Sequence, residues 1–235
     1  NVQYPWEVNS TDRCFLQLPI WFQAIKGVSA TKSGIMNLPM ILGLVIVSIV
    51  SGGLITAIGY YTPFMLASSV IMAIGAGLLT TFEVDTAHPA WIGYQALFGI
   101  GVGLGMQQPL ICVQTALPAP DIPIGTAVMM FSQTLGGALF ISVGQNVFTN
   151  QLIKNLAIEA PGVPTELVLA TGATYLKTAV QRINEALLPN VLRAYNDALT
   201  QTWYVSVAMS ALSILGAAFV QWKSVKGKKI EMAAA

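Results

Sequence analysis

The sequence has little charge: Asp, Glu, Lys and Arg together make up 9% of its 235 residues, whereas a soluble domain carries about 25%. Hydrophobic residues make up 54%, and the mean hydropathy is +0.66. These values exclude an ordinary soluble domain and indicate a membrane protein. The formal net charge of +1 provides no basic surface for nucleic acid, so no nucleic-acid partner is expected.

Residues that carry out catalysis or bind metals are also scarce. His88 is the single histidine, and we interpret it, beside Glu83 and Asp85, as a solvated loop residue rather than a metal ligand. Cys14 and Cys112 lie too far apart to suggest a metal site or a disulfide framework. The sequence has no G-x-S-x-G motif and no carboxylates at metal-ligand spacing. We therefore predict no catalytic residues, no metal, no cofactor and no enzymatic activity.

What the sequence does have is long charge-free runs. Residues 91–115 form 25 positions without a charge, and a helix of that length crosses the ~30 Å hydrocarbon core of a bilayer with some tilt. The same reasoning predicts transmembrane helices at 38–58, 63–82, 91–115, 124–148 and 203–222, with a partial one at 18–26. The predicted fold class is thus an all-α membrane protein with five full spans and one truncated span.

The remaining segments are polar. Residues 1–17 form an atypical polar N-terminal segment. The sequence begins at Asn1 with no initiator Met and no signal-peptide pattern, which leads us to expect a fragment or a truncated gene model. The segment 149–202 holds apolar residues at helical spacing among its charges, which predicts one or two amphipathic helices lying outside the membrane plane or along it. Four lysines lie in the tail 223–235, and lysines next to a span favour the cytoplasmic side. The C-terminus is therefore expected in the cytoplasm and the segment 149–202 on the extracellular side.

Glycines gather in two of the predicted spans. In a membrane, helices associate through van der Waals fit, so small residues let two backbones approach closely. The i, i+4 pairs within 91–115 predict one bare packing face on that helix. We interpret these glycines as helix-packing positions that permit rocking, rather than as ligand contacts. They are Gly99, Gly101, Gly103, Gly105, Gly136 and Gly137.

Three amide side chains fall well inside predicted spans, namely Gln107, Gln108 and Gln133. A polar group at this depth needs a partner in the protein interior or in a wet cavity. The rise of 1.5 Å per residue places Gln107 and Gln133 at about one level, and Pro109 predicts a kink. Two interpretations stay open: the amides line a central cavity and bind substrate, or they join helices by hydrogen bonds.

Five segments, taken as an ordered set, carry a family resemblance: LPIWFQAIKGVSATKSGIMNLPMILG (18–43), SGGLITAIGYYTPFM (51–65), GIGVGLGMQQPL (99–110), LPAPDIPIGTAVMMFSQTLGGALFISVGQNVF (117–148) and AYNDALT (194–200). They resemble the C-terminal half of fungal drug and toxin efflux pumps, in the fourteen-helix drug:proton antiporter branch of the major facilitator superfamily. The resemblance implies the C-terminal six-helix bundle of a carrier that exports hydrophobic drugs or fungal toxins against proton entry by alternating access. It also implies a plasma membrane protein, with vacuolar or vesicle membrane as the alternative.

The sequence departs from that family because the N-terminal bundle, with its proton-coupling acid, is missing. No acid of this sequence lies within a predicted span, so no residue here offers a proton carrier. We therefore expect inactivity without the N-terminal half. The expected partners are membrane lipid, a hydrophobic small molecule, a proton gradient and the missing N-terminal bundle. The alternative function is that of a non-transporting helical membrane subunit or scaffold.

Overall fold

The computed structural model describes residues 17–218, and every element in that range is helical. The predicted polar segment up to residue 16, the end of the last predicted span and the basic tail lie outside the described residues. In chain order the elements are η1 (Phe22–Lys26), α2 (Ala30–Met36), α3 (Leu38–Ile58), α4 (Thr62–Leu79), α5 (His88–Gly105), α6 (Gln108–Ala116), η2 (Ala119–Asp121), α7 (Ile122–Glu159), α8 (Thr165–Asn184), η3 (Glu185–Leu187) and α9 (Leu188–Ala218).

Five helical stretches in the described range are long and apolar enough to cross a membrane. They are α3, α4, the pair α5 and α6, α7 with the short η2, and α9 with the helical segment before it. The predicted all-α membrane fold with five full spans is confirmed.

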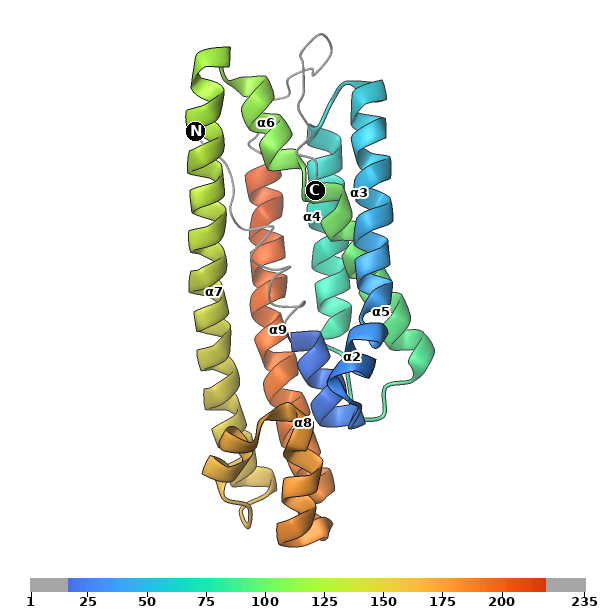
Figure 1. Ribbon diagram of the computed structural model, residues 1–235, viewed down its shortest axis with the longest axis vertical. Coiled ribbons are helices and arrows are strands. Elements are labelled where there is room, and N and C mark those ends of the chain that lie inside the picture. Colours follow the sequence, from blue (N-terminus) through green and yellow to red (C-terminus); the bar gives the residue numbers. More distant parts are fainter. Residues whose placement is uncertain (1–16, 219–235) are drawn as a thin grey trace.

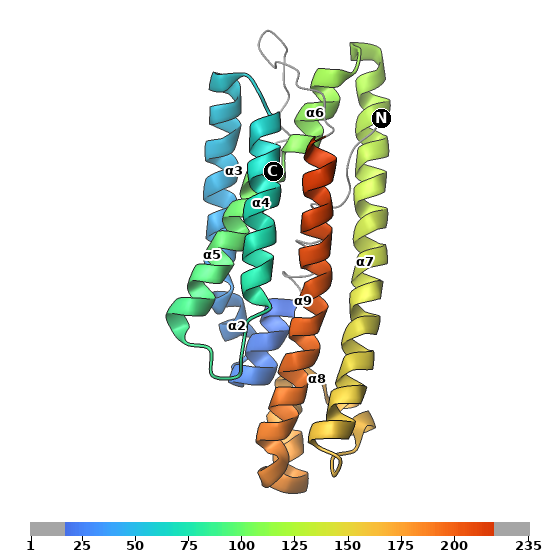
Figure 2. The ribbon, with the colours of Figure 1, turned by 180° about the vertical axis from the view of Figure 1, so that it is seen from behind.

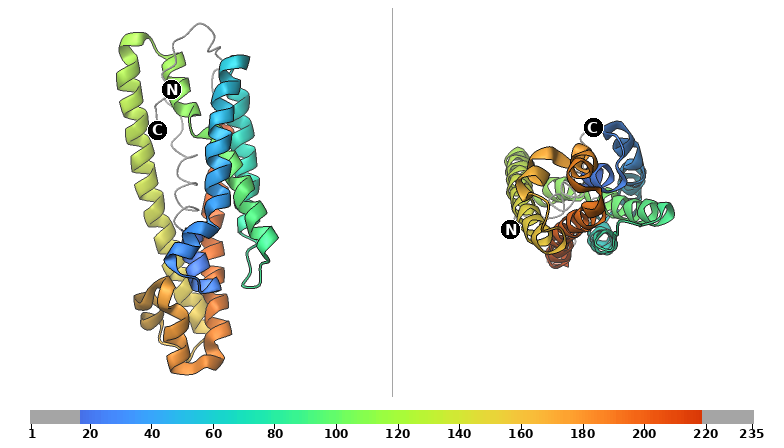
Figure 3. Two further views of the ribbon diagram at one scale, coloured as in Figure 1. Left: turned by 45° about the vertical axis from the view of Figure 1, so that its right-hand side comes forward. Right: turned by 90° about the horizontal axis from the view of Figure 1, so that it is seen from below.

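The long helices do not pack in chain order. α5 contacts both α3 and α4, α4 contacts α9, and α9 contacts α7. Seen end-on, these five helices follow one another around an arc (Figure 3). The two helices at the ends of the arc, α3 and α7, expose many large apolar side chains, which suits contact with lipid tails. Examples are Leu42, Ile46, Ile49, Phe131 and Leu139.

The two ends of the molecule differ (Figure 1). α8 lies with the last turns of α7 and the first turns of α9 at one end, which we call the α8 end. α6 and the turn at Gly59 lie at the other, which we call the α6 end. Gly59 adopts φ 88° and ends α3, and Pro63 stands in the first turn of α4. The reverse view shows α4, α9 and α7 side by side between these ends (Figure 2).

The predicted boundaries of the segment 149–202 do not coincide with helix ends. α7 continues to Glu159, and α9 begins at Leu188 and runs through Trp203 without a break. With 38 residues, α7 is about 57 Å long, well beyond the ~30 Å that a bilayer core requires. The extensions of the two helices stay helical because they pack on each other, as in the edge contact of Phe148 with Tyr195, whose ring centroids lie 5.2 Å apart.

Candidate functional site

α5 lies between α3 and α4 at contacts made through glycine. A Cβ atom on Gly99 would overlap the backbone of Met40 in α3. Gly103 lies against the backbone of α3 one turn further along. A Cβ atom on Gly101 would lie 2.6 Å from the backbone nitrogen of Met72 in α4. The predicted single bare face is therefore wrong: positions two apart point about 200° apart on a helix, so the glycines serve two neighbours.

The other three predicted glycines are also buried. Gly105 is the last residue of α5, and Gly136 and Gly137 lie among the buried residues of α7. Buried glycines inside membrane helices are typical of close packing. That these positions permit rocking of the helices stays a prediction.

The predicted kink after the glycine-rich stretch is a break between α5 and α6. Pro109 has no N–H group for the carbonyl of Gly105, so one bond of the helical ladder is missing. The Gln108 amide nitrogen donates to the backbone oxygen of Leu104 at 2.8 Å. Gln108 is fully buried, and this bond is local to the break between α5 and α6, while its side-chain oxygen has no partner in the described part of the chain. Whether Gln108 lines a cavity or joins neighbouring helices stays a prediction.

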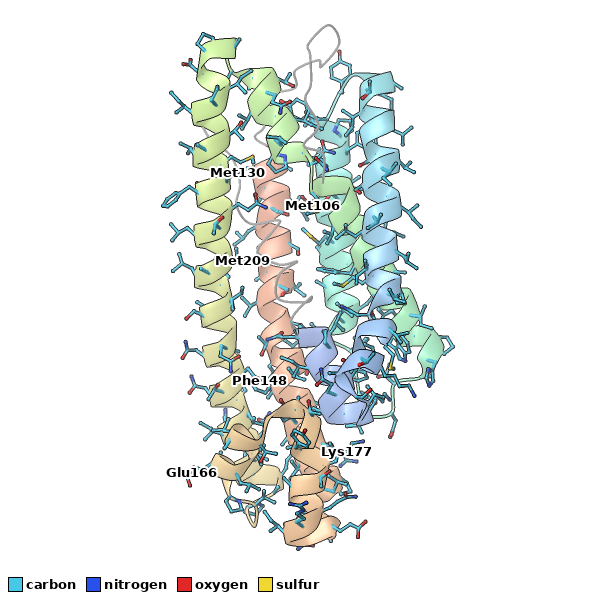
Figure 4. All side chains as sticks on the ribbon, viewed as in Figure 1. Met106, Met130, Phe148, Glu166, Lys177 and Met209 are labelled. Atoms are coloured by element: carbon cyan, nitrogen blue, oxygen red, sulfur yellow. The ribbon has the colours of Figure 1, made fainter. Side chains whose placement is uncertain are left out.

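Gln107 and Gln133 are arranged differently. Both are half-buried, and neither side chain has a hydrogen-bond partner among the residues that the structure describes. The structure does not bring the two amides together as a bonded pair. Met106, which precedes Gln107 in the break between α5 and α6, and Met130, one turn before Gln133 on α7, are 52% and 53% exposed. Figure 4 shows Met130 on α7, Met209 on α9 and Met106 near the break between α5 and α6. That these side chains line a cavity stays a prediction.

Aromatic rings close the interior toward the α8 end. We call Trp21, Phe22, Phe82, Trp91 and Trp203 the aromatic cluster. Its neighbouring ring centroids lie 4.7 to 5.3 Å apart, the spacing of favourable edge and tilted contacts. These rings come from residues 17–26, the turn after α4, α5 and α9, so they join segments distant in the sequence.

Asn196 in α9 completes this closure with two buried hydrogen bonds. Its side-chain oxygen accepts from the Trp21 indole nitrogen at 2.8 Å, and its amide nitrogen donates to the backbone oxygen of Phe82 at 2.9 Å. In the sequence, the segment AYNDALT contributed only to the family resemblance. An Asn on the apolar face of a predicted amphipathic helix is the feature that could have revealed this role.

Two lysines lie at the same end of the molecule. The Lys26 ammonium group donates to the backbone oxygens of Val84 and Thr86 at 2.8 and 3.0 Å. Lys177 of α8 lies against Gly27, and partial burial, with the charge of Lys26, lowers the pKa of Lys177. Lys26 thus joins the α4–α5 connection to the end of the first helical segment. α8 is joined to that segment by the Thr174 hydroxyl, which donates to the Gln23 side-chain oxygen at 2.6 Å. Within residues 17–218, no group of three or more His, Cys, Asp or Glu could hold a metal.

Comparison with known proteins agrees with this architecture. The sequence matches no profile of a known protein family. It is 59% identical over 93% of its length to an efflux pump named MFS1 of Trichophyton rubrum and 56% identical over 89% to the efflux pump roqT of Penicillium rubens. It is 53% identical over 85% to the acetylaranotin efflux transporter ataA of Aspergillus terreus. The chain spans about 40% of the length of these curated relatives.

The chain is therefore an integral membrane protein homologous to a segment of transporters. Over the matched segment it is a homologue of fungal efflux pumps of the major facilitator superfamily. The predicted resemblance to fungal efflux pumps of the major facilitator superfamily is confirmed, whereas membership of the fourteen-helix drug:proton antiporter branch stays a prediction.

Proposed function

We propose that this chain forms the C-terminal bundle of a proton-coupled exporter of hydrophobic drugs or fungal toxins that works by alternating access. The names of the relatives support export, and one of them names a small-molecule cargo, acetylaranotin. The observation that carries the proposal is the burial and the hydrogen bonding of the Gln107 and Gln133 side chains. Both amides lie at membrane depth, half-buried and without a partner in the described chain. Such groups are costly against lipid tails and suit a wet cavity that receives cargo.

Proton coupling needs a group that this chain does not offer. The predicted spans contain no Asp or Glu, and intramembrane acids are the usual proton carriers of transporters. The coupling residue then belongs to the N-terminal bundle of the complete pump, and this chain alone neither couples protons nor transports. Its partners are membrane lipid, a hydrophobic cargo, the proton gradient and the N-terminal bundle. It has no enzymatic role, lies in the plasma membrane and places its C-terminus in the cytoplasm.

A chimera tests this function. The chain replaces the matching segment of the Trichophyton rubrum pump, and export of rhodamine 6G from yeast is followed by fluorescence. We expect export that stops when a protonophore collapses the proton gradient. Replacing both Gln107 and Gln133 by Leu should slow export about tenfold or more, because each lost hydrogen bond contributes about 1 kcal/mol. Gly93→Ala, at an exposed position of α5 with open space around it, is the control and should export normally.

Three outcomes contradict parts of the proposal. Export that persists with the protonophore would exclude proton coupling. A chimera that reaches the membrane in normal amounts but does not export would favour the non-transporting subunit. Transport by the chain alone in liposomes would show that it needs no second bundle.

A further inference from the structure

Gln95 in α5 is a buried amide that sequence reasoning did not single out. Its side chain is fully buried, and neither its oxygen nor its nitrogen has a hydrogen-bond partner in the described part of the chain. Buried polar groups in proteins nearly always have partners, so each exception needs an explanation. In a membrane helix an unpaired polar group is first a candidate for function.

Two further unpaired polar atoms lie near Gln95. Trp91 stands one turn earlier on the same face of α5, and its buried indole nitrogen has no partner among the described residues. The close contact of Gly99 with Met40 fixes the register of α5 against α3. From that register we infer that, one turn earlier, Gln95 of α5 lies beside Asn37, the N-cap residue of α3, whose buried side-chain oxygen is also unpaired.

These atoms define the chemistry of the group that would satisfy them. The indole N–H donates only, the Asn37 oxygen accepts, and the Gln95 amide does both. None of these three side chains carries a charge; the His88 ring packs on Trp91, with ring centroids 5.5 Å apart, but it is not one of the unpaired groups. The matching group is uncharged and has both a donor and an acceptor, such as a hydroxyl or a carboxamide.

We propose that Asn37, Trp91 and Gln95 form a binding site for the hydroxyl or carboxamide group of a hydrophobic cargo; this deepens, and rests on, the exporter function proposed above. The aromatic cluster covers the site, since Phe22 packs on Trp91 with ring centroids 5.0 Å apart. Cargo therefore meets the site when the helices move, and a bound cargo shifts the population toward the open state. A buried water molecule has the same hydrogen-bonding chemistry, and the experiment separates the two sources.

The test uses the purified 235-residue chain in lipid nanodiscs. Gln95→Met removes an amide whose oxygen and nitrogen are both unpaired, at nearly constant length. Gln108→Met is the matched control, because the Gln108 amide nitrogen is bonded to Leu104 and only its oxygen is unpaired. Thermal unfolding is recorded without ligand, with 2-naphthamide and with 2-ethylnaphthalene, which lacks the donor and the acceptor. Without ligand we expect Gln95→Met to melt no lower than the wild type, and Gln108→Met to melt lower.

With ligand, 2-naphthamide should bind Gln95→Met about fivefold to tenfold more weakly than the wild type, as expected for one neutral hydrogen bond. 2-Ethylnaphthalene should bind both equally, and Gln108→Met should bind both compounds as the wild type does. Destabilisation of Gln95→Met without ligand would assign the amide to a buried water and overturn the proposal. So would equal affinity of both proteins for 2-naphthamide, or no binding to the wild type.

The exporter function and the binding site at Asn37, Trp91 and Gln95 can be contradicted independently of each other. Rhodamine 6G export by the chimera tests the exporter function, whereas the nanodisc experiment tests this site alone. An exporting chimera together with unchanged 2-naphthamide affinity would remove the site and leave the function.

Discussion

At the residue scale, Asn196 makes the clearest single contribution to how the chain holds together. It is 4% exposed and bonds to both Trp21 and Phe82. Asn196→Ala leaves a buried indole N–H and a buried carbonyl unpaired, which should lower the free energy of unfolding by about 2–3 kcal/mol. Denaturant unfolding in detergent, followed by tryptophan fluorescence, measures this loss.

The control for Asn196 is another asparagine. Asn146 is exposed and donates only to the backbone oxygen of Ser142, one turn earlier in its own helix. Asn146→Ala should therefore change stability by less than about 0.5 kcal/mol. Equal losses in the two variants would contradict the role given to Asn196.

The glycines of α5 provide a second prediction at this scale. Gly101→Ala places a methyl group 2.6 Å from the Met72 backbone nitrogen, and backbone cannot yield as a side-chain tip does. Overpacking of this kind should cost about 1–3 kcal/mol. Gly93→Ala, on the same helix with nothing within 4 Å, should be neutral or slightly stabilising. The same unfolding experiment compares them, and a tolerated Gly101→Ala would show that α4 and α5 are less tightly packed.

Sequence reasoning placed the amides at membrane depth but could not say which are paired. Gln107, Gln108 and Gln133 have the same side chain, and only the geometry of the break after Gly105 brings Gln108 to the Leu104 oxygen. Gln95 was missed for the opposite reason. It lies near the end of its apolar run, where interfacial water would satisfy an amide, whereas in the structure it is sealed.

At the scale of elements, the sequence predicted the long apolar helices but not where they end. The length of a charge-free run predicts a transmembrane helix, because charged side chains are costly in hydrocarbon. This length does not show whether a helix continues into water, because there the helix is stabilised by packing against its neighbours. α7 and α9 extend beyond the predicted spans because the stripe Phe148, Leu152 and Leu156 is buried along α7 and apolar residues are likewise buried along α9.

The contact between the extensions of α7 and α9 should depend on pH. Partial burial, and next the charge of Asp197, raise the pKa of Glu159, while Arg193 opposes them. An acid whose pKa is raised in the folded state adds stability below its unfolded pKa, and this contribution is lost as pH rises through the folded pKa. Acidification from neutral pH should therefore stabilise this contact, by less than about 1 kcal/mol because solvent screens the charges.

Glu159→Gln tests this dependence. Its amide protection factors at the ends of α7 and α9, which correct hydrogen exchange for its intrinsic pH dependence, are measured between about pH 4 and pH 7. They should be higher than wild type at neutral pH and nearly independent of pH. The Asn190 side chain donates to the backbone oxygen of Glu159, so that bond survives the substitution. Glu166→Gln, at an exposed site on α8 (Figure 4), is the control for loss of one acidic charge. An unchanged pH profile in Glu159→Gln would assign the effect to another group.

At the scale of the whole molecule, the sequence predicted the number of spans but not their neighbours. Nothing in the apolar runs says that α5 lies between α3 and α4, or that α9 separates α4 from α7. The glycine positions indicate close contacts, but a glycine in the sequence does not show which helix it contacts. The order follows from shape: Gly99 and Gly101 point to opposite sides of α5, and only a helix between two others uses both.

Orientation in the membrane is the last prediction, and it follows from counting helices. Tyr60 lies at the α6 end and is 42% exposed, and Tyr175 lies on α8 and is 67% exposed. α4, the α5–α6 pair and α7 separate them, and an odd number of crossings puts them on opposite sides of the bilayer. Because the lysine-rich tail is expected in the cytoplasm, we predict that Tyr175 is extracellular and Tyr60 cytoplasmic.

Cysteines at these two positions report the sides, in a background where Cys14 and Cys112 are replaced by Ser. A membrane-impermeant maleimide should label Tyr175→Cys in intact yeast, and Tyr60→Cys only after permeabilisation, with at least a tenfold difference in each case. Inverted labelling would overturn the orientation and keep the three crossings. Labelling of both positions from one side would contradict the crossings themselves, because three spans cannot return the chain to the side from which it started.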